Sequence, residues 1–337
     1  MSEFVPDVTF VVAAYNAADT IVRAVESALR QEGVAVEVVV VDDRSSDGTV
    51  GIVSTIGDPR VRLFALEHNR GPGGARNVGL AAARGKWIAV LDSDDTVRPD
   101  RLARMIERAE KSGAQVVVDN LDVVSLDGRS VRMFSEAELV RQPLLTLAAF
   151  IGSNVIFRSQ HNFGYMKPVF ERRFLEEHDL RFDEALRIGE DYILLASALA
   201  SGGRCAIEPS AGYIYHIREG SISRVLKLDH IDAMMSADEA FLRRYPLDVL
   251  SERMQRKRTR GFHQARSFLL LVEQLKKRSL AGALKAALAD PLALRHLHMP
   301  IAVRLRRLAA RSAETAPMTV AAERSPLGGE SPHTSKG

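Results

Sequence analysis

The sequence predicts an α/β fold, in which a mainly parallel sheet flanked by helices is followed by a basic helical C-terminal extension. Three observations favour this fold. Over the first 120 residues, short apolar and β-branched runs alternate with segments of helical spacing, which is typical of βαβ units. Polar, acidic or glycine-rich turns separate those runs. Beyond Leu228, apolar residues recur at helical spacing among many Lys and Arg residues.

The first 120 residues supply five expected strands and four expected helices. The strands, several apolar enough to be buried on both faces, are Val8–Ala14, Val36–Val41, Val61–Leu66, Lys86–Leu91 and Gln115–Val118. The expected helices are Ala18–Gln31, Thr49–Ile56, Gly74–Arg84 and a segment from Pro99 to about Lys111. Sites in such sheets lie beyond the carboxyl ends of the strands, where each acidic cluster of the first 100 residues falls.

The rest of the chain divides into three parts. Ser125–Gln142 is polar and reads as a loop or short hairpin, whereas Glu190–Ala200 is an amphipathic helix that ends before two glycines. We therefore expect one domain over residues 1–228, with halves at 1–120 and 121–228. A basic helical region over 229–311 and a Pro/Gly/Ser-rich disordered tail over 312–337 follow.

Composition and charge limit the classes of partner. The single cysteine, Cys205, excludes an intramolecular disulfide and a Cys-based zinc cluster. Neither a secretion signal nor a run of roughly 20 apolar residues is apparent, so we expect a cytoplasmic protein. Residues 251–311 carry 15 Lys/Arg and three acidic residues, a net +12, which leaves about −9 for the remainder. The basic region favours an anionic membrane surface, with a merely solvated helical face as the alternative. Nucleic acid is disfavoured, because no recognition motif appears and the rest of the chain is acidic.

Two acidic clusters follow expected strands. Asp42 and Asp43 end the run VVVVDD, and a carboxylate there can accept a hydrogen bond from a base or ribose. Turn and cap chemistry is the alternative, and it accounts for Ser46 or Asp47.

The second cluster is VLDSDD at residues 90–95. By strand alternation Asp92 and Asp94 project together while Ser93 and Asp95 point away, and the nearest cations in sequence, Lys86 and Arg98, are not placed to match both carboxylates. The pair is suited to one hard divalent cation, with solvated loop charges as the alternative.

The order FVVAAYNAADT, VVVVDDRSSDGT and HNRGPGGARNVGLAAARGKWIAVLDSDD resembles the family 2 inverting glycosyltransferases of GT-A fold. The resemblance covers residues 8–100 and again 164–224, with Ala13 standing where many relatives have proline. It implies a Rossmann-like, nucleotide-binding sheet, with the nucleotide-sugar half at 1–120 and the acceptor half at 121–228.

For the donor half, the resemblance implies a UDP-sugar. Tyr15 would border the uracil and Asp43 would hydrogen-bond the base, with Asp42 as the second member of that pair. Gly73 would allow close approach of backbone to ligand, although a simple turn before the helix is the alternative. Arg76 and Asn77 would help to hold an anion on the first helical turn.

The resemblance also implies a Mg²⁺ or Mn²⁺ cofactor. The family's DxD element falls on Asp92 and Asp94, with Asp94 as the main metal contact and Asp95 as an adjacent candidate. In GYIYHIREGSIS, His216 would complete the metal shell and Arg218 would neutralise the leaving UDP. A surface histidine and a rim arginine are the alternatives for this stretch, which also holds Ser221 and Ser223.

For the acceptor half, the match falls on LRIGEDYILLASAL. Asp191 would be the base that takes the proton from the acceptor hydroxyl, with Glu190 orienting the acceptor. The alternative is that both carboxylates only favour a helix N-terminus. Lys167 and Phe174, in the preceding segment, are expected to be structural.

Within that family the chain most resembles glucosyltransferases of bacterial exopolysaccharide assembly of the succinoglycan type. This resemblance implies transfer of a hexose, glucose in the first instance, from a UDP-sugar to a polyprenyl-diphosphate-linked saccharide. We expect peripheral attachment at the inner face of the cytoplasmic membrane, and a homo-oligomer or association with other assembly enzymes is compatible with this role. The other classes are a nucleotidyltransferase and a non-catalytic UDP-sugar-binding module. The intact Glu190-Asp191 pair argues against the second.

Overall fold

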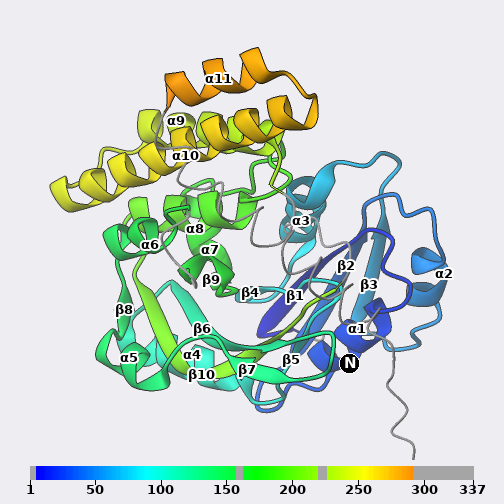
Figure 1. The fold of residues 1–337 in the computed structure, drawn as a ribbon. Coiled ribbons are helices and arrows are strands. Elements are labelled where there is room, and N and C mark those ends of the chain that lie inside the picture. Colours follow the sequence, from blue (N-terminus) through cyan, green and yellow to red (C-terminus); the bar gives the residue numbers. More distant parts are fainter. Residues whose placement is uncertain (1–4, 157–161, 219–225, 291–337) are drawn as a thin grey trace, which may run out of the picture.

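The computed structural model describes residues 5–156, 162–218 and 226–290 (Figure 1). Its centre is a ten-stranded sheet. The strands of the first half are β1 (Val8–Ala14), β2 (Val36–Asp42), β3 (Val61–Ala65), β4 (Trp87–Val90) and β5 (Thr96–Val97). The remaining strands are β6 (Val116–Val124), β7 (Ser130–Arg132), β8 (Leu144–Leu145), β9 (Val169–Glu171) and β10 (Cys205–His216).

The nucleotide half contains the four predicted helices, with shifted ends. They are α1 (Ile21–Leu29), α2 (Thr49–Ser54), α3 (Gly71–Ala82) and α4 (Arg101–Ser112). Helix α1 illustrates why the apolar spacing predicted these helices. One of its faces is buried and consists of Ile21, Ala24, Val25 and Ala28. Helix α3 begins three residues earlier than predicted, at a glycine in left-handed conformation.

The main path of the sheet runs β3-β2-β1-β4-β9-β6-β10-β5. Strand β1 pairs parallel with β2 and β4, and β2 pairs parallel with β3, as the apolar runs predicted. Their valines lie in the core. Strand β9 is antiparallel to both β4 and β6, so the acceptor half inserts one of its strands into the sheet of the nucleotide half.

The polar segment after β6 begins with a hairpin, which is one of the two structures expected for it, a loop or a short hairpin. Strand β7 pairs antiparallel with β6, and Gly128 takes a positive φ in the turn between them. The other elements of this half are α5 (Glu136–Arg141), α6 (Leu147–Ser153), a 3₁₀ turn (Phe163–Tyr165), α7 (Arg172–Glu177) and α8 (Glu190–Ala200). The bounds of α8 match the predicted helix.

Three helices follow: α9 (Leu228–Arg244), α10 (Val249–Lys276) and α11 (Leu280–Ala289). They lie together above α6 and α8, and α10 contacts both α6 and α11 (Figure 1). The described part of the basic region, residues 229–290, is therefore anchored to the domain. Arg258 of α10 is buried, lies 2.9 Å from Asp238, donates to the Asn154 carbonyl and stacks on Tyr192. In the described part of the chain, no helix is both long and apolar enough to cross a bilayer. The predicted tail at 312–337 lies outside the described residues.

Candidate active site

The candidate residues gather at the carboxyl edge of the parallel strands. Strand β1 lies between β2 and β4, so the chain reverses direction across the sheet at this point. Such a switch point opens a crevice beyond the strand ends, where ligands of open α/β sheets bind. Tyr15 follows β1, Asp42 ends β2, and Asp92 follows β4 by one intervening residue. The sequence prediction of one shared edge is confirmed.

The loop after β1 is fastened to the loop after β2. Asn16 has a φ of 50°, its backbone N–H donates to Ser45 Oγ at 2.9 Å, and its side-chain oxygen accepts from the Ser46 N–H at 2.8 Å. The Tyr15 ring is left 53% exposed beside this junction. Asp47 accepts from the Thr49 N–H at 3.0 Å, which confirms the turn chemistry considered for that position.

Asp42 and Asp43 have different surroundings. Asp43 accepts from the Arg70 N–H at 2.6 Å and the Gly71 N–H at 2.8 Å, so it caps helix α3 from another strand. Burial raises the pKa of Asp43, although these two N–H groups act in the opposite direction. Asp42 accepts from the Ser45 N–H through Oδ2, whereas its buried Oδ1 has no hydrogen-bond partner among the described residues. Of the two residues, it is therefore Asp42 whose Oδ1 atom can still accept a hydrogen bond from a ligand.

The glycine-rich motif contacts the acceptor half. The Asn77 side chain forms two hydrogen bonds with the backbone of Phe182. It donates to the Phe182 carbonyl at 3.0 Å and accepts from the Phe182 N–H at 2.9 Å. A Cβ at Gly73 would lie 2.7 Å from the Asp183 carbonyl oxygen, so the close approach that requires glycine here is to that backbone. The contacts give Gly73 and Asn77 a structural role, and their assignment to the donor stays a prediction.

Arg76 lies among three carboxylates instead of pointing at an open anion site. Its guanidinium is 2.7 Å from Asp92, 2.5 Å from Glu190 and 3.2 Å from Asp191, and its side chain is 7% exposed. The Phe182 ring lies beneath it, 5.4 Å away. One arginine of the nucleotide half thus holds both members of the predicted acceptor pair.

Lys167 is the second cation of this cluster, and sequence reasoning missed its place there. Its Nζ lies 2.7 Å from Asp92 and 2.9 Å from Asp191. Arg76 and Lys167 reach Asp92 from distant parts of the chain, whereas Lys86 and Arg98, the nearest cations in sequence, pair with other carboxylates. Although burial alone would raise the pKa values of Asp92 and Asp191, Lys167 and Arg76 hold both below their ordinary range.

The DSDD segment is a turn, so the alternation of a strand does not apply to it. Strand β4 ends at Val90, and the Asp95 N–H donates to the Asp92 carbonyl at 3.1 Å. Asp95 is fully buried and accepts from the Tyr213 hydroxyl at 2.8 Å and from the His216 N–H at 2.8 Å. Burial and the charges of Asp92 and Asp94 raise its pKa. Asp95 therefore fastens the turn to β10.

Asp94 differs from Asp92 and Asp95, because its carboxylate forms neither an ion pair nor a hydrogen bond with another described residue. Burial and the charge of Asp92 raise its pKa, while Arg218 and Lys167 lower it. Arg23, which sequence reasoning did not single out, donates to the Asp94 carbonyl at 2.8 Å. Arg218 is also within 3.5 Å of the Thr20 hydroxyl, and its charge acts on Asp94, while its assignment to the leaving UDP stays a prediction.

Two further residues complete the arrangement. The Tyr213 hydroxyl accepts from the Asp92 N–H at 3.2 Å while it donates to Asp95, so one phenol orders both ends of the turn. His216 Nε2 lies 3.1 Å from the Thr96 hydroxyl, and burial together with the charge of Arg23 lowers its pKa. Ser221 and Ser223 of the same predicted motif lie outside the described residues.

The carboxylates of the acidic turn differ in their capacity to bind a metal ion. The described residues contain no group of three or more His, Cys, Asp and Glu side chains placed to hold one. Both carboxylate oxygens of Asp92 and of Asp95 are engaged by protein donors. Asp94 is the available carboxylate, and a Mg²⁺ or Mn²⁺ ion commonly takes one or two carboxylates with phosphate and water oxygens. The site fits such an ion through Asp94.

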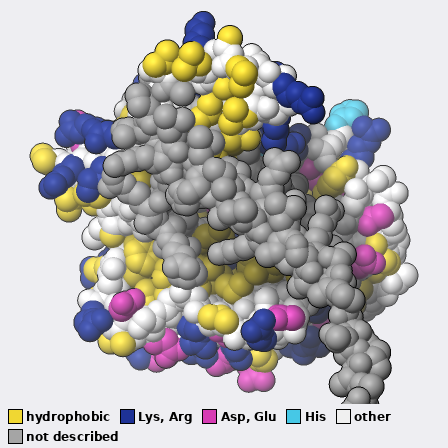
Figure 2. Space-filling model, viewed as in Figure 1, with side chains coloured by type: hydrophobic (Ala, Val, Ile, Leu, Met, Phe, Trp, Pro, Cys, Tyr) yellow, Lys and Arg dark blue, Asp and Glu magenta, His cyan; other side chains and the backbone are white. Residues whose placement is uncertain are grey.

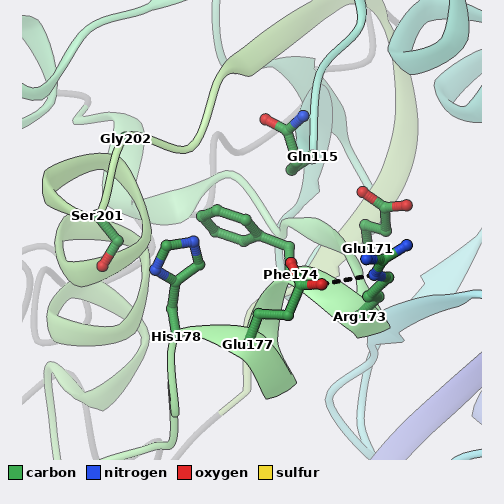
Figure 3. Close-up of a pocket in the computed structure, with 8 residues that line it drawn as sticks. All are labelled: Gln115, Glu171, Arg173, Phe174, Glu177, His178, Ser201 and Gly202. Atoms are coloured by element: carbon green, nitrogen blue, oxygen red, sulfur yellow. Dashed lines mark hydrogen bonds and ion pairs between the residues drawn. The ribbon is translucent and has the colours of Figure 1, made fainter.

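A separate pocket of about 360 Å³ lies elsewhere (Figure 3). It is lined by Gln115, Glu171, Arg173, Phe174, Glu177, His178, Ser201 and Gly202. Gln115 precedes β6 and Glu171 ends the antiparallel β9, so this pocket opens at the amino edge of the parallel strands. It contains none of the candidate site residues. Phe174 packs there against His178, 4.6 Å between ring centres, which fits the structural role expected for it.

The mostly parallel sheet flanked by helices, with acidic residues at its switch point, has the architecture of the GT-A fold. The model for "Glycosyl transferase family 2" matches residues 9–174. The chain is 77% identical over 341 aligned positions to the succinoglycan biosynthesis protein ExoO of Rhizobium meliloti, covering 99% of this chain and 98% of that one. The chain belongs to glycosyltransferase family 2.

Two more distant proteins resemble this chain. One is WfgD of Escherichia coli, a UDP-Glc:alpha-D-GlcNAc-diphosphoundecaprenol beta-1,3-glucosyltransferase, 28% identical over 64% of this chain and 79% of that one. The other is the crystal structure of S. aureus TarS 1–349 in complex with UDP. It superimposes with a TM-score of 0.59 at 18% identity, over 83% of this chain and 90% of that one, and it supports the fold.

Proposed function

We propose that this glycosyltransferase moves a hexose, glucose in the first instance, from a UDP-sugar to a polyprenyl-diphosphate-linked oligosaccharide in bacterial exopolysaccharide assembly of the succinoglycan type. The similarity to ExoO over the whole chain supports the pathway. The printed activity of WfgD supports the UDP-glucose donor and the lipid-linked acceptor. The observation that carries the proposal is geometric: Asp191, the candidate base, is held beside Asp92 at the switch point of the sheet.

The reaction is a direct displacement. The acceptor hydroxyl gives its proton to Asp191, its oxygen bonds to the anomeric carbon, and the bond from that carbon to the diphosphate breaks with its electron pair leaving on UDP. Since nearby cations depress the pKa of Asp191, the proton moves only as the new bond forms. Glu190, held by Arg76, lies next to the base to orient the acceptor. Arg218, beside the acidic turn, is placed to offset the charge that develops on UDP.

On the nucleotide side, Tyr15 supplies an exposed ring for the uracil, and Asp42 supplies the unused acceptor for its N–H group. Asp94 would hold a Mg²⁺ or Mn²⁺ ion, and such an ion would neutralise diphosphate charge when bound. Both carboxylate oxygens of Asp92 form ion pairs, one with Arg76 and one with Lys167. We therefore propose that Asp92 orders the site and does not bind the metal ion.

A transfer assay tests this function. The purified chain is incubated with a panel of UDP-sugars and a polyprenyl-diphosphate-linked acceptor fraction, with and without Mn²⁺, and released UDP and labelled lipid are measured. UDP release coupled to lipid labelling supports the proposal, and Asp191→Asn should lower kcat by about 10²-fold or more. Full activity of Asp191→Asn with unchanged donor affinity would exclude Asp191 as the base. Asp94→Asn should abolish any stimulation by Mn²⁺.

The same assay separates the two other classes. A nucleotidyltransferase would release pyrophosphate, and a binding module would bind UDP-sugar without releasing UDP. Either result would replace the transferase proposal. The paired Glu190 and Asp191 at the start of α8, both engaged by Arg76, favour transfer over simple binding.

We also propose that the C-terminal helices dock on an anionic membrane. Leu280, Leu284 and Leu288, 61–80% exposed, follow one another on one face of α11. Figure 2 shows hydrophobic side chains with Lys and Arg beside them at the top of the molecule, where α11 lies in Figure 1. Lys276, Lys277 and Lys285 are close in sequence, and this mixture of leucines and cations suits lipid headgroups.

Vesicle co-sedimentation tests the docking face. Binding to vesicles with anionic lipid but not to zwitterionic vesicles is expected, and a triple Leu→Ser variant at 280, 284 and 288 should lose it. Val249→Ser, at an 82% exposed position on the first turn of α10, is the matched control. Equal binding of the triple variant, or self-association that competes with vesicle binding, would assign the face to another partner.

A further inference from the structure

Outside the residues assigned so far, Lys167 stands out because it contacts two of them at once. It lies just before β9, the strand that the acceptor half inserts between β4 and β6. Its side chain is 11% exposed, and its Nζ is close to Asp92 of the acidic turn and to Asp191 of α8. A buried lysine between a turn and a helix that are far apart in sequence links their positions.

Arg76 and Lys167 bridge the same two carboxylates. Arg76 contacts Oδ1 of Asp92 at 2.7 Å and Oδ1 of Asp191 at 3.2 Å. Lys167 contacts Oδ2 of Asp92 at 2.7 Å and Oδ2 of Asp191 at 2.9 Å. The four side chains form a closed ring of alternating charge. Because each oxygen of Asp191 has its own cation, both the position and the rotation of that carboxylate are fixed.

The ring leaves Asp191 able to act. Its side chain is 21% exposed, whereas those of Arg76 and Lys167 are 7% and 11% exposed. The Asp191 carboxylate is thus more exposed to solvent than either cation that holds it. Each carboxylate oxygen has a second lone pair after accepting one hydrogen bond, so an acceptor hydroxyl can still be bound.

We propose that Lys167 is a positioning residue that, with Arg76, orients the Asp191 carboxylate toward the acceptor hydroxyl and ties it to the turn that begins the donor site. This inference rests on the proposed function, because it takes Asp191 as the base. With one cation removed, Asp191 keeps a single contact and its carboxylate can rotate. Productive alignment is then lost in part, which lowers the rate of transfer at saturating substrate.

Charge gives a second readout. Four charged side chains act on Asp191: Arg76 of α3 and Lys167 lower its pKa, while Asp92 of the acidic turn and the adjacent Glu190 favour its protonated form. Loss of Lys167 removes a cation 2.9 Å away, so the pKa of Asp191 rises. The base works ionised, and the acid limb of the pH profile of kcat should therefore move to higher pH.

The test compares Lys167→Met, Lys167→Arg and the control Lys86→Met in the transfer assay with saturating donor. Lys86 is 60% exposed and distant from the site, so its variant should match the wild type. Lys167→Met should lower kcat by about 10-fold or more and move the acid limb upward by about one pH unit. Lys167→Arg, which keeps the charge, should leave the acid limb near its wild-type position. Circular dichroism and a melting curve establish that each variant folds, and Lys167→Gln replaces Lys167→Met if the latter does not fold.

The outcomes are distinct. A fall in kcat that is equal at every pH, or a wild-type kcat in folded Lys167→Met, would overturn the role of Lys167. An inactive wild-type chain, or an unimpaired Asp191→Asn variant, would instead overturn the proposed function. Loss of activity at Asp191→Asn together with a shifted acid limb at Lys167→Met supports both.

Discussion

Replacement of Arg76 by methionine tests the energetics of the charged cluster. The variant keeps the length and apolar stem of the side chain and removes its charge. Arg76 contacts Asp92, Glu190 and Asp191, all largely buried, and only Lys167 remains to offset them. Breaking a buried ion pair by removing one partner typically costs about 3–5 kcal/mol, because the other charge stays buried without a partner or water to stabilise it. We expect a loss of that size in the free energy of unfolding.

Urea unfolding followed by fluorescence of the single tryptophan, Trp87, measures this loss. Trp87 lies buried in β4, the strand that leads to the acidic turn. With a denaturant slope of about 3 kcal/mol per molar, the midpoint should fall by about 1 M or more. Arg30→Met is the matched control, because Arg30 pairs with Glu26 on the exposed face of α1 and such pairs contribute about 1 kcal/mol or less.

The pH dependence has a defined sign. Arg76 and Lys167 depress the pKa values of Asp92 and Asp191, so the stability they confer is present above the unfolded values near pH 4 and is lost as the pH falls below them. Without Arg76 these pKa values rise, as does that of Glu190, and acid then stabilises the variant. The gap between wild type and Arg76→Met should therefore narrow from pH 7 to about pH 5. A loss under 1 kcal/mol, or a gap that widens on acidification, would refute this reasoning.

Three further predictions follow from single contacts. Asp43→Ala leaves two N–H groups of α3 unpaired and should cost about 1–2 kcal/mol in urea unfolding, whereas Asp42→Asn should weaken UDP binding in calorimetry with little loss of stability; the reverse pattern would exchange their roles. Tyr213→Phe removes the two hydrogen bonds between the Tyr213 hydroxyl and the acidic turn and should cost about 1–3 kcal/mol and lower donor affinity. Tyr165→Phe, at a 41% exposed position, should change neither stability nor donor affinity. Cys205 is 1% exposed and burial raises its pKa, so a thiol reagent should modify it at the rate of unfolding; rapid reaction of the native chain would contradict this packing.

The parallel part of the fold could be predicted because its signals are local. Strands such as Val36–Asp42 are buried on both faces and read as continuous apolar runs. The bounds of the helix Glu190–Ala200 were predicted correctly, because the spacing of its apolar residues and the glycines near its ends are visible in the sequence. The shared edge then followed from the rule for strand ends.

What could not be predicted depends on tertiary contacts. Helix α3 begins at Gly71, within a glycine-rich stretch of poor helix propensity, because Asp43, which directly follows β2, caps it. Strand β9 has three residues, too few for any periodicity to show. Since Lys167 lies at the entry to β9, its contact with Asp92 and Asp191 was equally hidden, and sequence reasoning assigned it a structural role.

The glycine-rich motif limits how this enzyme can be recombined with its relatives. Asn77 and Gly73 of the nucleotide half fit the backbone at Phe182 and Asp183, and Arg76 holds the acidic pair of the acceptor half. A chimera that takes residues 121–228 from another family member therefore imports surfaces that must match residues 70–77. We therefore expect such grafts to fold only when residues 70–77 and residues 121–228 are exchanged together.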